Sequence, residues 1–154
     1  MTEQEFWTLI ASIDQDTLVS QDDDAALEPL LDDLLDLTEP DLFEFDELLA
    51  LKLYALDGEV YAAHAGESGE SGDGFLYIRC YVVASGREFY EDVVRNPERM
   101  PNSIEQWCEG LLYVYLKAWA ELTGNGDEDW PHFSTVSYET GSNQSQWPTL
   151  NDDA

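Results

Sequence analysis

Positive charge is scarce in this sequence. Its 154 residues include six Lys and Arg against 34 Asp and Glu, which leaves a formal net charge of −28. Most carboxylates therefore lack a cationic partner within the chain and must face water or another molecule. Such a charge repels nucleic acid and anionic lipid, and it favours fast association with positively charged surfaces. We therefore expect no direct binding to nucleic acid and no binding to membranes.

Residues and motifs that carry common chemistry are equally sparse. Cys80 and Cys108 lack CxxC spacing, which predicts two buried, reduced thiols. His64 and His132 are the only histidines, and the HExxH, GxSxG and GxxxxGK motifs are absent. No segment approaches 18 consecutive uncharged apolar residues, and the N-terminal residues lack the pattern of a signal peptide. We predict a cytoplasmic, non-enzymatic protein with no catalytic residues, no metal site and no cofactor.

The apolar content nevertheless predicts a folded chain. Hydrophobic residues make up 44% and aromatic residues 12% of the sequence, which is too much for an intrinsically disordered acidic chain. Most of the apolar residues recur at helical spacing. We predict a mainly α fold: a single compact helical domain of about six or seven helices over residues 1–124, with an irregular acidic C-terminal extension over 125–154.

Capping residues and prolines predict where several helices begin and end. Thr2 and Glu5 have the spacing of a capping box, and TEPD at 38–41 begins a helix that continues to about Leu56. The segment 87–97 predicts a helix that stops before its final proline.

Three later segments are harder to assign. Residues 74–86 are apolar at both strand and helix spacing, so periodicity leaves the choice open. Ser103 and Gln106 predict the start of a long apolar helix that ends at Gly124. In the C-terminal extension we predict a hairpin around 139–144 and a poorly ordered acidic end.

The largest concentration of negative charge lies near the N-terminus. Residues 1–57 contain 17 acids and one base, and residues 21–41 contain no Lys or Arg. Leucines between residues 27 and 35 predict the buried face of a helix, and Pro29 predicts a short turn before that helix. Acids four residues apart then lie on another face with an axial spacing of about 6 Å. Each such pair costs a few tenths of a kcal/mol, so their repetition suggests a use outside the fold.

Three blocks of the sequence resemble a known family. EFWTLI at 5–10, DGFLYIRCYVVASGREFYEDVVRNPERMP at 73–101 and LLYVYLKAWAELTG at 111–124 are similar to the proteins grouped as domain of unknown function 4240. The resemblance covers about residues 3–124. It implies a mainly helical bacterial domain and favours a helix over 74–86, and it implies no activity. The glycine-rich segment 66–72 departs from the family pattern.

Asp73, Phe75 and Arg79 allow two interpretations. The carboxylate and the guanidinium could frame a small polar ligand. In the structural interpretation Asp73 caps a helix, Phe75 belongs to the core and Arg79 forms an internal salt bridge.

The acidic surface predicts a binding protein of bacterial or phage origin that neutralises a basic protein. If it is an immunity protein, its partner would be a toxin. If it is an inhibitor that imitates the charge of DNA, its partner would be a nuclease or another nucleic-acid-binding protein. The alternative is a halophile-adapted or housekeeping domain whose acids hold water, with a small-ligand site near Asp73 and Arg79. The oligomeric state is not indicated by the sequence. Charge density places the partner-binding residues at Asp22, Asp23, Asp24, Glu28, Asp32, Asp33, Asp36, Glu67, Glu70 and Asp73.

Overall fold

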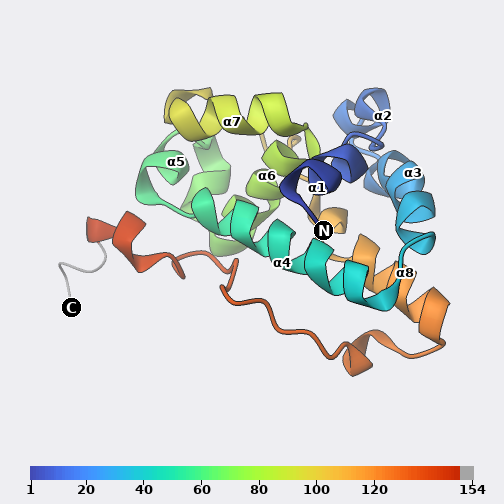
Figure 1. Ribbon diagram of the computed structural model, residues 1–154. Coiled ribbons are helices and arrows are strands. Elements are labelled where there is room, and N and C mark those ends of the chain that lie inside the picture. Colours follow the sequence, from blue (N-terminus) through green and yellow to red (C-terminus); the bar gives the residue numbers. More distant parts are fainter. Residues whose placement is uncertain (150–154) are drawn as a thin grey trace.

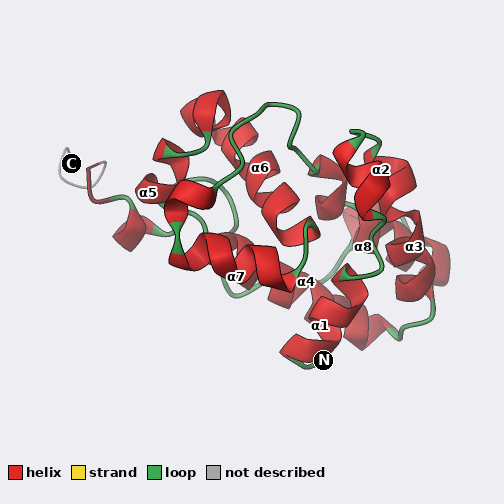
Figure 2. Ribbon diagram, turned by 90° about the horizontal axis from the view of Figure 1, so that it is seen from above, coloured by secondary structure: helices red, strands yellow, loops and turns green. Residues whose placement is uncertain are grey.

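A computed structural model describes residues 1–149. Within this range the chain forms eight α-helices and five short 3-10 helices, and it contains no strand (Figures 1 and 2). The predicted mainly helical, single-domain fold is therefore confirmed. The α-helices are α1 (Glu3–Ile10), α2 (Gln15–Val19), α3 (Asp23–Leu35), α4 (Glu39–Ala55), α5 (Glu59–Ala63), α6 (Gly72–Ala84), α7 (Arg87–Arg95) and α8 (Val114–Thr123). The 3-10 helices are η1 (Gly66–Glu70), η2 (Pro97–Arg99), η3 (Glu109–Leu112), η4 (Asp127–Asp129) and η5 (Gln144–Gln146).

Helix α6 forms the centre of the molecule. It lies between α7 and α4, and η3 packs against it (Figures 1 and 2). Ten of its 13 residues are buried, so almost every direction around the helix is apolar. This explains why the sequence of α6 fits both a strand and a helix, and the helix favoured by the family resemblance is confirmed.

The capping signals at the first and fourth helices are confirmed. The Thr2 hydroxyl accepts a hydrogen bond from Glu5 N at 3.1 Å, and the Glu5 carboxylate accepts one from Thr2 N at 2.9 Å. Thr38 is the N-cap of α4, where its hydroxyl accepts a hydrogen bond from Asp41 N, and Pro40 lies in the first turn. Helix α7 ends at Arg95, two residues before its proline.

Helix α3 begins earlier than the sequence predicts. Asp22 caps it, and Pro29 lies inside the helix and not in a turn before it. The prediction is wrong because a proline in a helix only removes the donor for the carbonyl four residues earlier and crowds it. That carbonyl belongs to Ala25, and both Ala25 and Pro29 are exposed, so water can reach it.

The predicted helix start at Ser103 is also wrong. Gln106 Oε1 accepts a hydrogen bond from Ser103 N at 3.1 Å, but these residues form a turn that does not continue into an α-helix. Instead, Cys108 N donates to the Tyr77 carbonyl of α6 at 3.1 Å, which ties the segment to the core. Helix α8 begins only at Val114.

The end of α8 agrees with the sequence prediction, whereas helix α2 was not predicted. Gly124 ends α8 with a left-handed φ of +77°, as expected for a glycine after a helix. The short helix α2, capped by Asp14, is one that the sequence pattern does not predict.

The C-terminal segment, residues 125–149, runs along α4 (Figure 1). The hairpin predicted around 139–144 does not form: these residues make turns, and η5 follows. The acidic end, predicted to be poorly ordered, lies at 150–154, outside the described residues. The division of the chain at residue 124 stays a prediction.

Asp57 fastens the C-terminal segment to the helices. It is fully buried just after α4, and both of its carboxylate oxygens accept hydrogen bonds. Oδ1 accepts from Gly141 N at 3.0 Å and from Trp147 Nε1 at 2.9 Å, and Oδ2 accepts from Asn143 N at 2.9 Å. Three donors on one carboxylate fix both the backbone and a side chain of the segment.

Arg79 provides the second attachment, from α6. Its guanidinium donates to the carbonyls of Leu53 at 2.9 Å and Tyr138 at 3.0 Å, and to Thr140 Oγ1 at 3.1 Å. It also stacks 4.7 Å from the centre of the Phe75 ring. Burial lowers the pKa of Arg79, and the negative charge of Asp57 opposes this shift. The expected internal salt bridge is thus replaced by hydrogen bonds to carbonyls and a hydroxyl.

Candidate functional site

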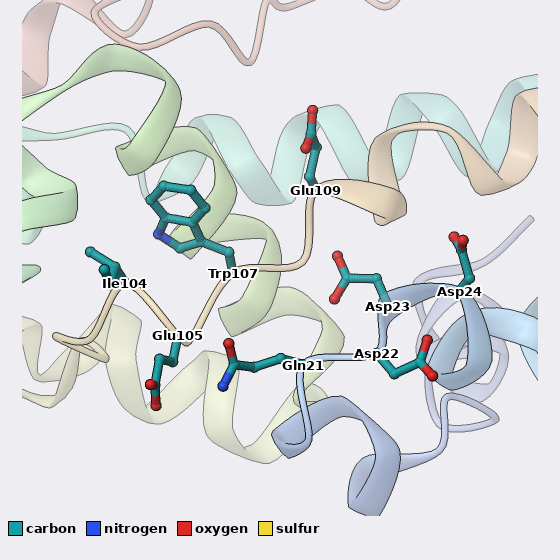
Figure 3. Close-up of a pocket in the computed structure, with 8 residues that line it drawn as sticks. All are labelled: Gln21, Asp22, Asp23, Asp24, Ile104, Glu105, Trp107 and Glu109. Carbon is teal, nitrogen blue, oxygen red and sulfur yellow. The ribbon is translucent and has the colours of Figure 1, made fainter.

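An acidic cleft lies where the start of α3 faces the segment that leads into η3 (Figure 3). Its volume is about 460 Å³. We call it the acidic cleft; its lining residues are Gln21, Asp22, Asp23, Asp24, Ile104, Glu105, Trp107 and Glu109.

Local helix chemistry places the first carboxylates of the acidic cleft. Asp22 accepts a hydrogen bond from Ala25 N at 3.2 Å as the N-cap of α3. Asp23 and Asp24 follow in the first turn, where the positive end of the helix dipole favours negative charge. The sequence thus collects three acids at this point partly for a structural reason, which does not explain the further acids opposite them.

Asp23 is the carboxylate most affected by its surroundings. It is half-buried, and its Oδ2 accepts from Gly110 N across 3.5 Å. Burial raises the pKa of Asp23, and the charges of Asp24, Glu109 and Asp22 raise it further. The scaffold therefore holds this carboxylate among like charges, with one long hydrogen bond in compensation.

Two backbone positions near Asp23 are conformationally or sterically restricted. A Cβ atom on Gly110 would lie 2.8 Å from Leu27 Cδ1, so any other residue there would require the Leu27 side chain to move. Gln21 has a positive φ of 65°, unlike every other non-glycine residue between 1 and 149. Such a conformation costs on the order of 1 kcal/mol.

Trp107 forms a rigid wall of the acidic cleft. Its Nε1 donates to Ser68 Oγ of η1 at 2.9 Å, and its ring meets Tyr77 edge-on with centroids 5.5 Å apart. In Figure 3 the neighbouring carboxylates point in different directions rather than toward one point. Accordingly, no group of three or more His, Cys, Asp or Glu residues within 1–149 is arranged to hold a metal ion. The spacing favours several separate contacts with a cationic surface.

The chain's cations are placed mostly elsewhere. Lys117 Nζ lies 3.7 Å from Asp24 Oδ1, a surface ion pair that contributes little. Around α1 and α7, Lys52 pairs with Glu3, and Arg87 pairs with Glu91 at 2.9 Å. The acidic cleft is therefore left with a large excess of negative charge.

The other predicted acids lie outside this cleft. Glu28, Asp32, Asp33 and Asp36 are exposed on or just after α3, and Asp36 is its C-cap. Glu67 and Glu70 are exposed on η1, and Asp73 is exposed in the first turn of α6. The structure thus brings together Asp22, Asp23 and Asp24, and leaves the remaining predicted residues as separate exposed charges.

Asp73 and Arg79 do not share a surface. Asp73 is exposed, whereas Arg79 is fully enclosed and its guanidinium already binds three protein oxygens. Asp73 is also not the cap of α6, because Ser71 Oγ accepts the hydrogen bond from Gly74 N at 2.9 Å. Phe75 is buried, as its structural interpretation expects.

Both cysteines are free and buried. Burial raises the pKa of Cys80 to about 12 and raises that of Cys108 as well. The thiols are therefore protonated and act as packing groups.

Sequence reasoning missed five of the eight residues that line the acidic cleft. Glu105, Trp107 and Glu109 belong to a segment that the pattern assigned to a helix, so nothing placed them opposite α3. It also missed Asp46, which is 5% exposed on α4. A signal was available for Asp46, since it lies within the apolar stripe formed by Leu42 and Leu49.

Together, these features define a helical domain with preformed anionic surface and a firmly attached C-terminal segment. The chain belongs to the protein family of unknown function DUF4240, whose model matches residues 1–138. The match extends beyond the resemblance over 3–124 and includes part of the C-terminal segment. Neither a curated protein nor a solved structure matches the chain. Among the described residues, no helix has the length and apolar character needed to cross a bilayer.

Proposed function

We propose that this protein binds and neutralises a basic protein through the acidic cleft and the neighbouring exposed acids of α3. The observation that carries the proposal is the half-buried Asp23, which is held among Asp22, Asp24 and Glu109 with one long hydrogen bond. A cationic group of a partner would relieve this repulsion and favour the ionised form of Asp23. Binding of a cation at Asp23 therefore relieves repulsion within the fold, which binding at a fully solvated acid would not do.

The charge distribution supports association with a basic surface over other partners. The net charge of −28 steers a cationic protein toward the molecule and repels polyanions. Rigid carboxylates suit either an immunity protein that covers a toxin or an inhibitor that occupies the nucleic-acid groove of an enzyme. Both alternatives require contact between these carboxylates and a cationic protein surface, so one experiment tests both.

The test is a pull-down from a bacterial lysate at low salt, followed by binding measurements with the recovered protein. Three charge-reversal pairs are compared: Glu105→Lys with Glu109→Lys in the acidic cleft, Asp32→Lys with Asp36→Lys on α3, and Glu88→Lys with Glu98→Lys as a control. All six residues are exposed, and each pair changes the net charge equally. We expect the cleft pair to weaken binding at least tenfold, the α3 pair less, and the control pair least.

Equal losses for all three pairs would show that only net charge matters and would defeat the proposed site. Recovery of no basic protein would count against the proposal as a whole. The hydration alternative is tested separately by unfolding the protein at increasing KCl concentration. A protein that needs molar salt to fold would favour that alternative, whereas a binding surface is compatible with folding in dilute buffer.

A further inference from the structure

A second cleft lies between the C-terminal segment and the helices α4 and α8. We call it the aromatic cleft, and its volume of about 540 Å³ is in the range of small-molecule sites. Five rings line it, and so do three carboxylates, whereas none of its lining residues is Lys or Arg. The rings belong to Tyr115, Trp130, His132, Phe133 and Tyr138, and the carboxylates to Asp46, Asp127 and Glu139.

The aromatic walls are held in place by packing. Trp130 meets Tyr115 with centroids 5.4 Å apart, Trp119 at 5.5 Å and Phe43 at 5.1 Å. The C-terminal segment is fixed beside them, because Thr135 N donates to Glu47 Oε2 at 2.9 Å. The walls of the aromatic cleft are therefore formed before any ligand arrives.

Asp46 provides a buried carboxyl group in this cleft. Burial raises the pKa of Asp46, while hydrogen bonds with Tyr115 and Trp130 and the proximity of His132 favour its ionised form. His132 Nε2 lies 3.7 Å from both Asp46 Oδ2 and Glu47 Oε2, which is too far for a hydrogen bond, and it is buried without a hydrogen-bond partner. Neither carboxylate is matched by a permanent cation.

Phe133 adds an exposed apolar surface to the lining of the cleft. Its side chain is 89% exposed, more than that of any other large hydrophobic residue within 1–149. A ligand that covers this ring would bind more tightly, because it would bury apolar surface and could place a cation against the ring face.

We propose that the aromatic cleft binds an organic cation of the guanidinium class, with Asp46 as the counter-charge and the rings around it as stacking surfaces. A planar guanidinium pairs with a carboxylate and stacks on aromatic rings, which a compact ammonium does less well. An anion is disfavoured because Asp46, Asp127 and Glu139 face the cleft and no Lys or Arg does. The guanidinium can come from a free small molecule or from an arginine side chain of a polypeptide.

This inference does not depend on the proposed function. The aromatic cleft and the acidic cleft share no lining residue, so either site can fail while the other stands. Each cleft also contains its own tryptophan, Trp130 or Trp107, whose indole N–H signal in an NMR spectrum reports on that cleft alone.

The experiment titrates the 15N-labelled full chain with N-acetyl-arginine amide at constant ionic strength. The matched controls are the citrulline derivative, which has a similar shape without the charge, and the lysine derivative. We expect saturable shifts of the Trp130 indole signal with the arginine compound, and binding at least tenfold weaker with the citrulline compound. Lysine should fall between them. Equal binding of arginine and citrulline compounds, or shifts confined to Trp107, would overturn the proposal.

Variants then locate the contacts. Asp46→Asn keeps the shape and should weaken arginine binding at least tenfold. Phe133→Ala changes an exposed residue, so it should leave the fold intact, as checked by circular dichroism, and weaken binding about threefold to tenfold. Glu88→Gln, an exposed control with the same charge change on α7, should bind as the unaltered chain does. If Phe133→Ala and Glu88→Gln bind alike, the aromatic cleft is not the site.

The source of the cation is decided by a second titration with the peptide Gly-Gly-Arg-Gly-Gly, its ends blocked. Binding of both compounds with similar affinity indicates a small-molecule site. Tighter binding of the peptide indicates an arginine presented by a polypeptide. Either result supports recognition of a guanidinium, and failure of both compounds to bind at millimolar concentration rejects it.

Discussion

Asp57 and Asp23 are both carboxylates near backbone N–H groups, yet their surroundings are opposite. Asp57 is enclosed, accepts three hydrogen bonds and is attracted by the buried Arg79. Asp23 is half-buried, has one hydrogen bond of 3.5 Å and is surrounded by other acids. In the first region charge serves the fold, because both carboxylate oxygens of Asp57 accept hydrogen bonds from the C-terminal segment. In the second the fold holds charge that it does not itself need.

The largest expected effect comes from removing the charge at the first region. Asp57→Ala leaves three donors of the C-terminal segment without an acceptor and the buried Arg79 without an opposite charge. We expect the free energy of unfolding to fall by about 3–5 kcal/mol. Urea denaturation measures this, and limited proteolysis should cut first within residues 138–147. A loss below about 1 kcal/mol would show that the segment is held by other contacts.

A smaller loss of stability is expected when Arg79 is replaced by a cation of another shape. Arg79→Lys retains the charge, but an ammonium cannot reach Leu53 O, Tyr138 O and Thr140 Oγ1 with the geometry of a guanidinium. We expect a loss of about 2 kcal/mol, from hydrogen bonds to a charged group. Urea denaturation of the variant beside Arg87→Lys, an exposed control, gives the comparison. Equal stability of the two variants would mean that charge alone matters at residue 79.

Removing the charge of Asp23, in the second region, should raise the stability of the fold, and the gain should depend on pH. Because the pKa of Asp23 is raised in the folded state, ionised Asp23 destabilises the fold at neutral pH, and this penalty disappears below the ordinary pKa of an aspartate. Asp23→Asn keeps an acceptor for Gly110 N and should raise the urea midpoint at pH 7. The two proteins should converge as the pH falls through about 4. A midpoint that is lower for Asp23→Asn at pH 7 would contradict this account.

The smallest effect is expected on the outer face of α3. Asp32→Asn with Asp36→Asn removes like-charge repulsion four residues apart, and Asp36 also lies at the negative end of the helix dipole. Stability should rise by a few tenths of a kcal/mol, and the gain should shrink in 1 M NaCl. A clear loss of stability in thermal unfolding would show that these acids have partners in the fold.

Local signals predicted much of this fold. Thr2 with Glu5 and Thr38 with Pro40 start helices through contacts within one turn, which the sequence displays directly. Ser103 and Gln106 make the predicted contact, but Trp107 and Cys108 are drawn to Ser68 and Tyr77 instead of continuing a helix. Tertiary packing overrides the local signal there, and the sequence does not show which distant segment will be nearby.

The candidate sites were predictable only in part, for the same reason. Asp22, Asp23 and Asp24 are adjacent in sequence and could be named, whereas Glu105 and Glu109 join them only through the fold. The aromatic cleft combines Asp46 of α4, Tyr115 of α8 and Trp130 of the C-terminal segment, which lie far apart in the sequence. Composition predicted an anionic surface, but the aromatic walls required the folded arrangement.

The attachment of residues 138–147 also constrains when the molecule can finish folding. These residues leave the ribosome after all eight α-helices have been synthesised. Until then neither Asp57 nor Arg79 has the partners that the C-terminal segment supplies, and burying both groups unmatched costs several kcal/mol. A nascent chain ending near residue 124 should therefore remain loosely packed and open to chaperones, and closure should coincide with emergence of residues 138–147.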